Sequence, residues 1–165
     1  VKALKDGRTP DLERPLHQGT EIDLSVPALI PADYLYDVHT RLVLYKRIAG
    51  METDEQLRDL QVEMIDRFGL LPESVKNLFR IASLKLLATP MGIRKIELGS
   101  EEGRILFDNE PLIDTDSLIE LIQSQPQYYR LEGGTKLRLY GDFNDEEHRF
   151  SRVNELLKTL VRKTH

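Results

Sequence analysis

The sequence predicts an α+β fold: N-terminal helices packed with a small antiparallel sheet of two hairpins and a C-terminal helix, preceded by an extended arm. Three observations support this prediction. Apolar residues recur at steps of three and four between residues 37 and 89, and again near the C-terminus. Apolar and polar residues alternate around two glycine-containing turns, GSEEG and EGGT. Four prolines interrupt the first 36 residues and oppose a helix there.

Residues 1–36 are predicted to form the extended arm, and residues 37–165 the domain that follows it. Within the arm, Ile22, Leu24 and Val26 alternate with polar residues, as expected of a half-buried strand that needs a neighbour. The chain begins VKALKDGR, without Met and within a helical pattern. We therefore expect it to be a piece of a longer protein.

The stretch from Thr53 to Pro72 is the best-marked helix. Thr53 and Gln56 have the spacing of a capping box. Gly69 suits a left-handed C-terminal cap, and Pro72 suits the first turn of the next helix, which is expected to end near residue 89. The apolar face is predicted to be buried and consists of Leu57, Leu60, Met64, Ile65 and Phe68.

The other side of this helix is acidic. Asp59, Glu63 and Asp66 follow one another at steps of four and three, and Glu55 extends the row. Like charges at this spacing destabilise a helix by roughly 0.2–0.5 kcal/mol per pair unless a basic group faces them. The row is therefore either a solvated helix face or a docking surface.

Expected N-cap residues mark where three further helices begin. Asp37 is the expected N-cap of a first helix that ends near Gly50 and exposes basic residues, with Val38, Leu42, Tyr45 and Ala49 on its apolar face. Asp114 is expected to cap a short helix between the hairpins. Asn144, with Glu147 three residues later, is expected to begin the terminal helix.

Composition describes an ordinary globular domain. Of 165 residues, 40% are hydrophobic and 31% are charged. The net charge of -5 argues against a dedicated nucleic-acid binder, which usually carries a basic surplus. The chain has no Cys, no long apolar run and no signal-peptide pattern, so we expect a cytoplasmic location and no membrane partner.

No catalytic motif is present in the sequence. It lacks a phosphate-binding G-x-x-x-x-G-K-[ST] loop, and its four His residues are not spaced as metal ligands. We therefore expect no catalytic residue, no cofactor and no metal in this chain.

A basic and aromatic strand face is the alternative functional feature. Such a face could hold single-stranded nucleic acid through phosphate contacts and base stacking, although basic residues also protect exposed strands from aggregation. The candidate contacts are Arg94, Arg104, Arg130, Lys136 and Arg138, with Tyr128, Tyr129 and Tyr140 nearby.

Several runs resemble the C-terminal end of bacterial transcription-repair coupling factors. They are PALIPADYLYDVHTRLVLYKRIA at residues 27–49, VEMIDRFGLLPE at 62–73, GIRKI at 92–96 and QPQYYRLEG at 125–133. The arm, LKDGRTPDLERPLHQGTEIDL, resembles the connection that leaves the second motor domain of this family. The resemblance implies an arm from that motor domain at 1–36 and a C-terminal regulatory domain at 37–165.

The resemblance also implies a function. Full-length members are DNA translocases that use ATP and Mg, displace stalled RNA polymerase from duplex DNA and recruit the damage-recognition protein of nucleotide excision repair. Their nucleotide-binding motifs lie upstream of this segment. Their C-terminal domain docks on an N-terminal helicase-like domain and masks the surface used for recruitment. The positions that match docking residues are Glu63 and Asp66, with Arg67 as a weaker member, and Asp59 belongs to the same acidic row.

Overall fold

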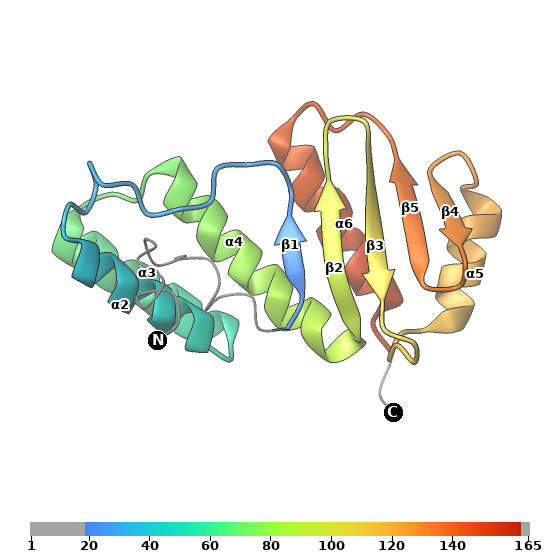
Figure 1. The fold of residues 1–165 in the computed structure, drawn as a ribbon, viewed down its shortest axis with the longest axis horizontal. Coiled ribbons are helices and arrows are strands. Elements are labelled where there is room, and N and C mark those ends of the chain that lie inside the picture. Colours follow the sequence, from blue (N-terminus) through green and yellow to red (C-terminus); the bar gives the residue numbers. More distant parts are fainter. Residues whose placement is uncertain (1–18, 163–165) are drawn as a thin grey trace, which may run out of the picture. The chain divides into compact units, whose positions relative to one another are not determined.

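The structure is a computed structural model that describes residues 19–162 (Figure 1). Three helices, a hairpin, a helix, a hairpin and a helix follow one another in the predicted order, so the α+β prediction is confirmed. The elements are β1 (Glu21–Asp23), α2 (Val38–Gly50), α3 (Asp54–Phe68), α4 (Glu73–Ala88), the 3₁₀ helix η2 (Thr89–Met91), β2 (Ile93–Leu98), β3 (Glu102–Phe107), α5 (Thr115–Ser124), β4 (Tyr129–Glu132), β5 (Lys136–Tyr140) and α6 (Glu146–Leu160).

The described chain forms two compact units. The helical unit comprises residues 28–82, and the sheet unit comprises residues 19–27 and 83–162, so that the boundary at residue 82 falls within α4. The division at residue 36 between an arm and a domain stays a prediction. Residues 1–18 of that arm lie outside the described residues.

The helical unit is organised around α3. Leu57, Leu60 and Met64 are almost fully buried, as predicted. The Thr53 hydroxyl oxygen accepts from the backbone N–H of Gln56 at 3.1 Å, which confirms the cap. The Gln56 side chain accepts from the N–H of Glu52 rather than from that of Thr53. The first bond satisfies a donor that a helix leaves unpaired at its start, and the second fixes the residue that precedes the cap.

Two details of α3 differ from the predictions. Ile65 was expected in the core but is 39% exposed, because it lies at the edge of the apolar stripe. Gly69 does cap the helix, and its N–H donates to the Ile65 carbonyl at 2.9 Å. Its φ of 99° and ψ of -175° are, however, outside the left-handed helical region and in one that only glycine occupies readily. The chain therefore leaves α3 extended, at a sharp corner.

The apolar face of α2 was also predicted imperfectly. Asp37 caps the helix as expected, but the buried residues are Leu44, Tyr45 and Ile48. Val38 and Ala49, which were assigned to the buried face, are exposed.

The sheet unit contains a five-stranded sheet in the order β1-β2-β3-β5-β4. The hairpins β2–β3 and β4–β5 are antiparallel as predicted, and β3 joins them by pairing antiparallel to β5. The sequence did not predict that β1 would pair parallel to β2, with Ile22 opposite Ile96. This strand is also shorter than the predicted alternation, since it ends at Asp23.

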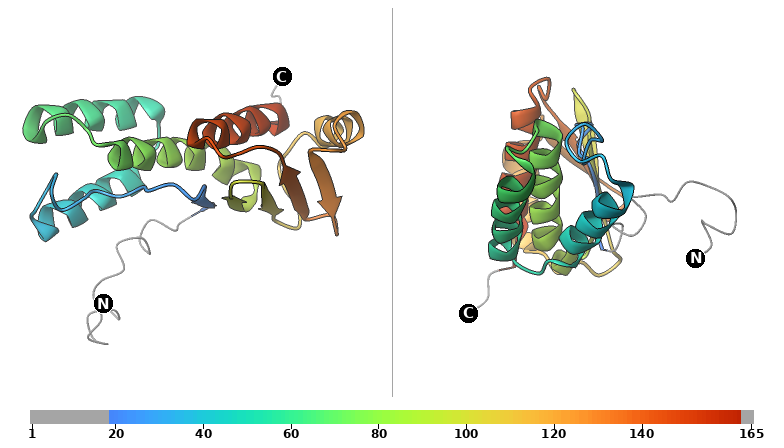
Figure 2. Two further views of the ribbon diagram at one scale, coloured as in Figure 1. Left: turned by 90° about the horizontal axis from the view of Figure 1, so that it is seen from above. Right: turned by 90° about the vertical axis from the view of Figure 1, so that its left-hand side faces the viewer.

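The helices α5 and α6 lie on one face of β3, β4 and β5, and no described helix of this unit covers the other face of these strands (Figures 1 and 2). Side chains that alternate toward the helices are buried, including Ile105, Leu137 and Leu139, and so is the apolar face of α6. The EGGT turn requires glycine because Gly133 and Gly134 have φ values of 62° and 79°.

Arg149 ties the first described residues to α6. The side chain of Arg149 is 8% exposed. Its guanidinium donates to the carbonyls of Phe143 at 2.6 Å, Leu24 at 3.1 Å and Ser25 at 3.0 Å. The helix that carries it begins one residue later than predicted, because Asp145 rather than Asn144 is the N-cap. A buried charge with three carbonyl partners is well compensated, and it fixes the chain on both sides.

We predict that Arg149→Met will lower the free energy of unfolding by about 2–4 kcal/mol, because three backbone carbonyls lose the hydrogen bonds that the guanidinium donates. Urea unfolding followed by circular dichroism measures this change. Lys158→Met on the exposed side of α6 is the control and should change stability little. Equal effects of the two substitutions would contradict the assigned role.

Candidate docking surface and charged sheet face

The outermost face of α3 carries three acids around an apolar residue. Glu55, Asp59 and Asp66 are exposed, and Val62 is 59% exposed. At 3.6 residues per turn, these four positions fall within an arc of about 60° on the side opposite the buried stripe. An apolar centre with a charged rim is the usual anatomy of a protein interface.

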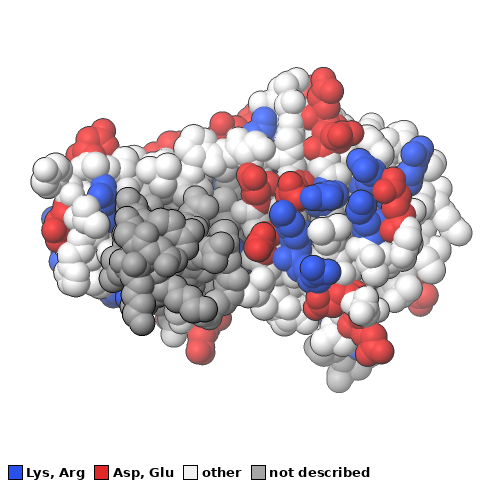
Figure 3. Space-filling model, viewed as in Figure 1, with Lys and Arg blue, Asp and Glu red and all other residues white. Residues whose placement is uncertain are grey.

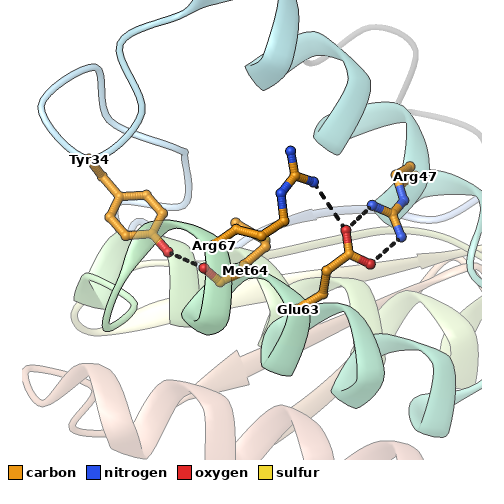
Figure 4. Close-up of polar contacts among 5 residues, drawn as sticks. All are labelled: Tyr34, Arg47, Glu63, Met64 and Arg67. Carbon is orange, nitrogen blue, oxygen red and sulfur yellow. Dashed lines mark hydrogen bonds and ion pairs between the residues drawn. The ribbon is translucent and has the colours of Figure 1, made fainter.

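Glu63 is not part of this outermost face. It lies beside α2, where its carboxylate accepts from both terminal nitrogens of Arg47 at 2.6 and 2.9 Å. Arg67, one turn further along α3, adds a third contact at 3.2 Å (Figure 4). Both Arg47 and Glu63 keep more than a third of their side-chain surface exposed. The bidentate pair therefore joins α2 to α3 at the surface of the helical unit.

The ion pair changes the acid–base behaviour of Glu63. Hydrogen bonding from Arg47 is the main cause that lowers the pKa of Glu63 to about 2, from an ordinary value of 4.5, and Arg67 contributes in the same direction. Glu63 is thus a carboxylate with its own basic partners. Asp59 and Asp66 have no side-chain partner among the described residues.

Arg67 is held by its neighbours as well. Its guanidinium lies 4.7 Å from the centre of the Phe68 ring, and the same ring meets Tyr34 edge to face. The Tyr34 hydroxyl donates to the Gly69 carbonyl at 2.9 Å and lies 3.4 Å from the Met64 carbonyl. These contacts hold the C-terminal end of α3 in place. Leu70, just beyond that end, is 84% exposed.

The four predicted docking residues thus have two kinds of surroundings. Asp59 and Asp66 face solvent together, whereas Glu63 and Arg67 are bonded to each other, and Glu63 also to α2. Sequence reasoning did not identify Val62 or the partner role of Arg47. Val62 could have been found, because it lies three residues after Asp59 and four before Asp66. The contact between Arg47 and Glu63 depends on how two helices pack, which spacing along one helix does not show.

The basic residues of the sheet are brought together only in part. Arg104, Arg138 and Arg130 stand directly opposite one another on β3, β5 and β4, and Lys136 is on the same face. Arg94 is different, because it lies at a break in the pairing of β2 with β3. Figure 3 shows Lys and Arg side chains gathered over these strands, with Asp and Glu among them.

Glutamates pair with several of these bases. Glu97 contacts Arg104 at 2.7 Å and Lys95 at 3.3 Å, and Glu132 contacts Arg138 at 3.0 Å. Hydrogen bonding from Arg104 is the main cause that lowers the pKa of Glu97 below its ordinary value. This face therefore carries both signs of charge and is not a uniformly positive track.

The predicted aromatic platform is not assembled on this face. Tyr129 is only 5% exposed, on the side of the helices. The guanidinium of Arg152, from α6, lies 5.3 Å from the ring centre of Tyr128 and 5.7 Å from that of Tyr129. Among the three tyrosines, only Tyr140 shares the strand face with the basic residues, by alternation along β5.

Within residues 19–162, no group of three or more His, Asp or Glu side chains is arranged to hold a metal ion. No helix in that range is both long and apolar enough to span a bilayer.

We predict that Glu63→Gln will destabilise the helical unit at neutral pH, because the neutral amide weakens the contacts with Arg47 and Arg67. A carboxylate whose folded pKa is depressed stabilises the fold above its unfolded pKa. The difference in unfolding free energy between wild type and variant should therefore be constant above about pH 5 and shrink as pH falls from about 4.5 toward 2. Urea unfolding across this range measures it.

Asp59→Asn removes a charge from the same helix without breaking a side-chain contact among the described residues, and it is the control. It should destabilise less than Glu63→Gln at pH 7. A pH-independent effect of Glu63→Gln would exclude the ion pair as its cause.

Comparisons with known proteins agree with this architecture. A family model, the TRCF domain, matches residues 24–118. The chain is 46% identical over 161 residues to the transcription-repair-coupling factor of Haemophilus influenzae and 43% identical over 160 residues to that of Escherichia coli K12. These matches cover 98% and 97% of this chain, but the chain spans only 14% of the length of each relative.

A crystal structure of the C-terminal domain of transcription-repair coupling factor has the same fold. It matches with a TM-score of 0.67 and 21% identity, over 86% of this chain and 93% of that one. The family model covers more than half of the chain, and the resemblance in its sequence motifs is thereby confirmed. The chain therefore belongs to the TRCF domain family of transcription-repair coupling factors.

Proposed function

We propose that this chain is a regulatory domain that docks through the acidic face of α3 on an N-terminal helicase-like domain of the same longer protein. Docking would mask the surface that recruits the damage-recognition protein of nucleotide excision repair, so the domain acts as an autoinhibitory brake. The longer protein would be the enzyme, an ATP- and Mg-dependent DNA translocase that acts on duplex DNA and stalled RNA polymerase. This chain would supply no catalytic group.

One observation carries the proposal: Asp59 and Asp66 lie exposed on either side of Val62 without a side-chain partner among the described residues. Unpaired acids at this spacing are mildly costly to the helix, and a basic surface on a partner would offset that cost. The exposed Val62 adds apolar area at the centre, where interfaces gain most of their binding energy.

Glu63 and Arg67 have a supporting role in this proposal. Because Arg47 and Arg67 already neutralise Glu63, its carboxylate has less to gain from a further basic partner. It holds α2 against α3 instead, so that the direction of the acidic face is fixed. The direct contacts are assigned to Asp59 and Asp66.

Such a brake can release. Exposed ion pairs contribute about 0–1 kcal/mol each, so a few of them hold mainly because both partners belong to one chain. When DNA, nucleotide or polymerase favours a motor conformation that separates the domains, the weak contact gives way. High salt should loosen it in part, since exposed charges are screened.

The alternative of a nucleic-acid-binding module remains a prediction. The basic strand residues carry paired glutamates, and two of the three tyrosines point elsewhere, so the sheet face supports this alternative less well than α3 supports docking.

We predict that Asp59→Arg together with Asp66→Arg in the full-length protein will raise basal ATPase activity and binding of the damage-recognition protein. Reversing two exposed charges should shift the closed–open ratio roughly 5- to 30-fold toward open. Both activities are measured without DNA, at low and at high salt. Glu120→Arg, an exposed acid of α5, has the same charge change per residue and should leave both unchanged.

If the double variant and Glu120→Arg behave alike, the docking proposal fails. The variants also keep the Arg47–Glu63 pair intact, so that an increase in activity cannot be attributed to loosening of the helical unit. Glu63→Gln in the same protein should have the smaller effect on recruitment.

A further inference from the structure

On the face of the sheet unit that no described helix covers, an apolar residue is surrounded by bases. Leu106 stands directly opposite Lys95 on β2 and Lys136 on β5, and Arg104 precedes it by two positions on β3. Its neighbours in sequence, Ile105 and Phe107, are buried toward the helices, so Leu106 faces the other way and is half-buried. We call Leu106 with Lys95, Arg104, Arg130, Lys136 and Arg138 the basic sheet face.

The arginine row of this face is unfavourable when it stands alone. Arg104, Arg138 and Arg130 occupy directly opposite positions on three adjacent strands, and like charges in that arrangement destabilise a sheet. Glu97 and Glu132 offset two of them. The side chain of Arg130 is exposed and has no partner among the described residues. An anionic group bound over the row would remove the repulsion.

A hollow adjoins the row. It has a volume of about 400 Å³, and Arg104, Arg138, Glu97, Glu102 and Leu98 are among the residues that line it. An anionic side chain placed there would meet two guanidinium groups with unused N–H donors, but it would also meet the carboxylates of Asp23, Glu97 and Glu102. The face therefore favours an anion whose charges are placed at particular points.

We propose that the basic sheet face binds an acidic polypeptide segment that presents an apolar side chain between carboxylates. The apolar side chain would cover Leu106, and the carboxylates would reach Arg130, Lys136 and the hollow. This surface belongs to the sheet unit and uses none of the docking residues of α3. The two proposals can therefore fail separately.

A nucleic acid fits the same face less well, for two physical reasons. Its evenly spaced phosphates would be repelled by Glu97, Glu102 and Glu132, all of which alternate toward this side of the sheet. Stacking would have to rely on Tyr140, because Tyr129 is buried and Tyr128 lies under Arg152. A half-buried leucine also contributes nothing to phosphate binding.

The test uses a fluorescent synthetic nonapeptide with one central Leu flanked by Glu residues. Binding to the protein is measured by fluorescence anisotropy, and the contact is located by amide shifts in NMR spectra. We expect saturable binding that weakens with salt, with shifts in β3, β4 and β5. A peptide with Ser in place of the Leu should bind more weakly. Arg130→Glu should weaken binding about five- to tenfold, as for one reversed charge pair.

Two further variants separate the basic sheet face from general charge. Leu106→Ser should also weaken binding, whereas Lys158→Glu, an exposed residue of α6, should not. Among the described residues, Arg130 makes no side-chain contact that its replacement would break, so loss of the fold does not explain its effect.

Any of three results overturns the proposal. The first is that the wild type shows no saturable binding of the peptide. The second is that Lys158→Glu and Arg130→Glu weaken binding equally. The third is that a single-stranded oligonucleotide binds the same face more tightly than the peptide does. Tighter binding of the oligonucleotide would show that the face binds nucleic acid. Asp59→Arg with Asp66→Arg should leave peptide binding intact, which distinguishes this surface from α3.

Discussion

The bidentate pair of Arg47 and Glu63 removes one acid from the surface that the helical unit offers to a partner. It joins two helices at their exposed margin by two N–H···O bonds, which add a specific geometry to the apolar packing. With α3 held in this orientation, Asp59, Val62 and Asp66 point outward and Glu63 does not. The acidic row looks uniform along the sequence. It is thereby divided into one paired member, Glu63, and three exposed members that have no side-chain partner among the described residues.

Charge is used differently on the two units. On α3 the exposed acids have no side-chain partner in the described part of the chain. A binding surface of this kind attracts a basic partner over a distance as well as on contact. On the sheet, Glu97 lies opposite Arg104 and Glu132 lies opposite Lys136, so the long-range attraction of the arginine row is partly cancelled. Recognition there would depend on the placement of individual groups around Leu106. The net charge of -5 is a sum over the whole chain, and it does not show that the two units distribute their charges differently.

Local sequence signals predicted most of the fold. The capping residues Asp37, Thr53 and Asp114 and the EGGT turn each have a mechanism that involves only neighbouring residues, and all were confirmed. The features that were missed or predicted wrongly depended on contacts beyond the local sequence. The parallel pairing of Ile22 with Ile96 is one example, and the exposure of Val38 and Ala49 on α2 is another. Periodicity shows that a helix has an apolar side, but neighbours decide its exact limits.

The parallel strand β1 also has a consequence for the order of folding. Glu21 pairs with Lys95, so this contact closes a loop of 74 positions (95 − 21). Closing a flexible loop of that length carries an entropic cost that grows to about 4 kcal/mol. If residues 28–82 fold first, the hydrogen bond from the Leu29 N–H to the Ser74 carbonyl joins the start of that unit to the first turn of α4, and much of the loop is already closed. The topology thus favours a hierarchy in which the helical unit forms early and the sheet gains its last strand late, with Thr20 and Arg149 securing it on both sides.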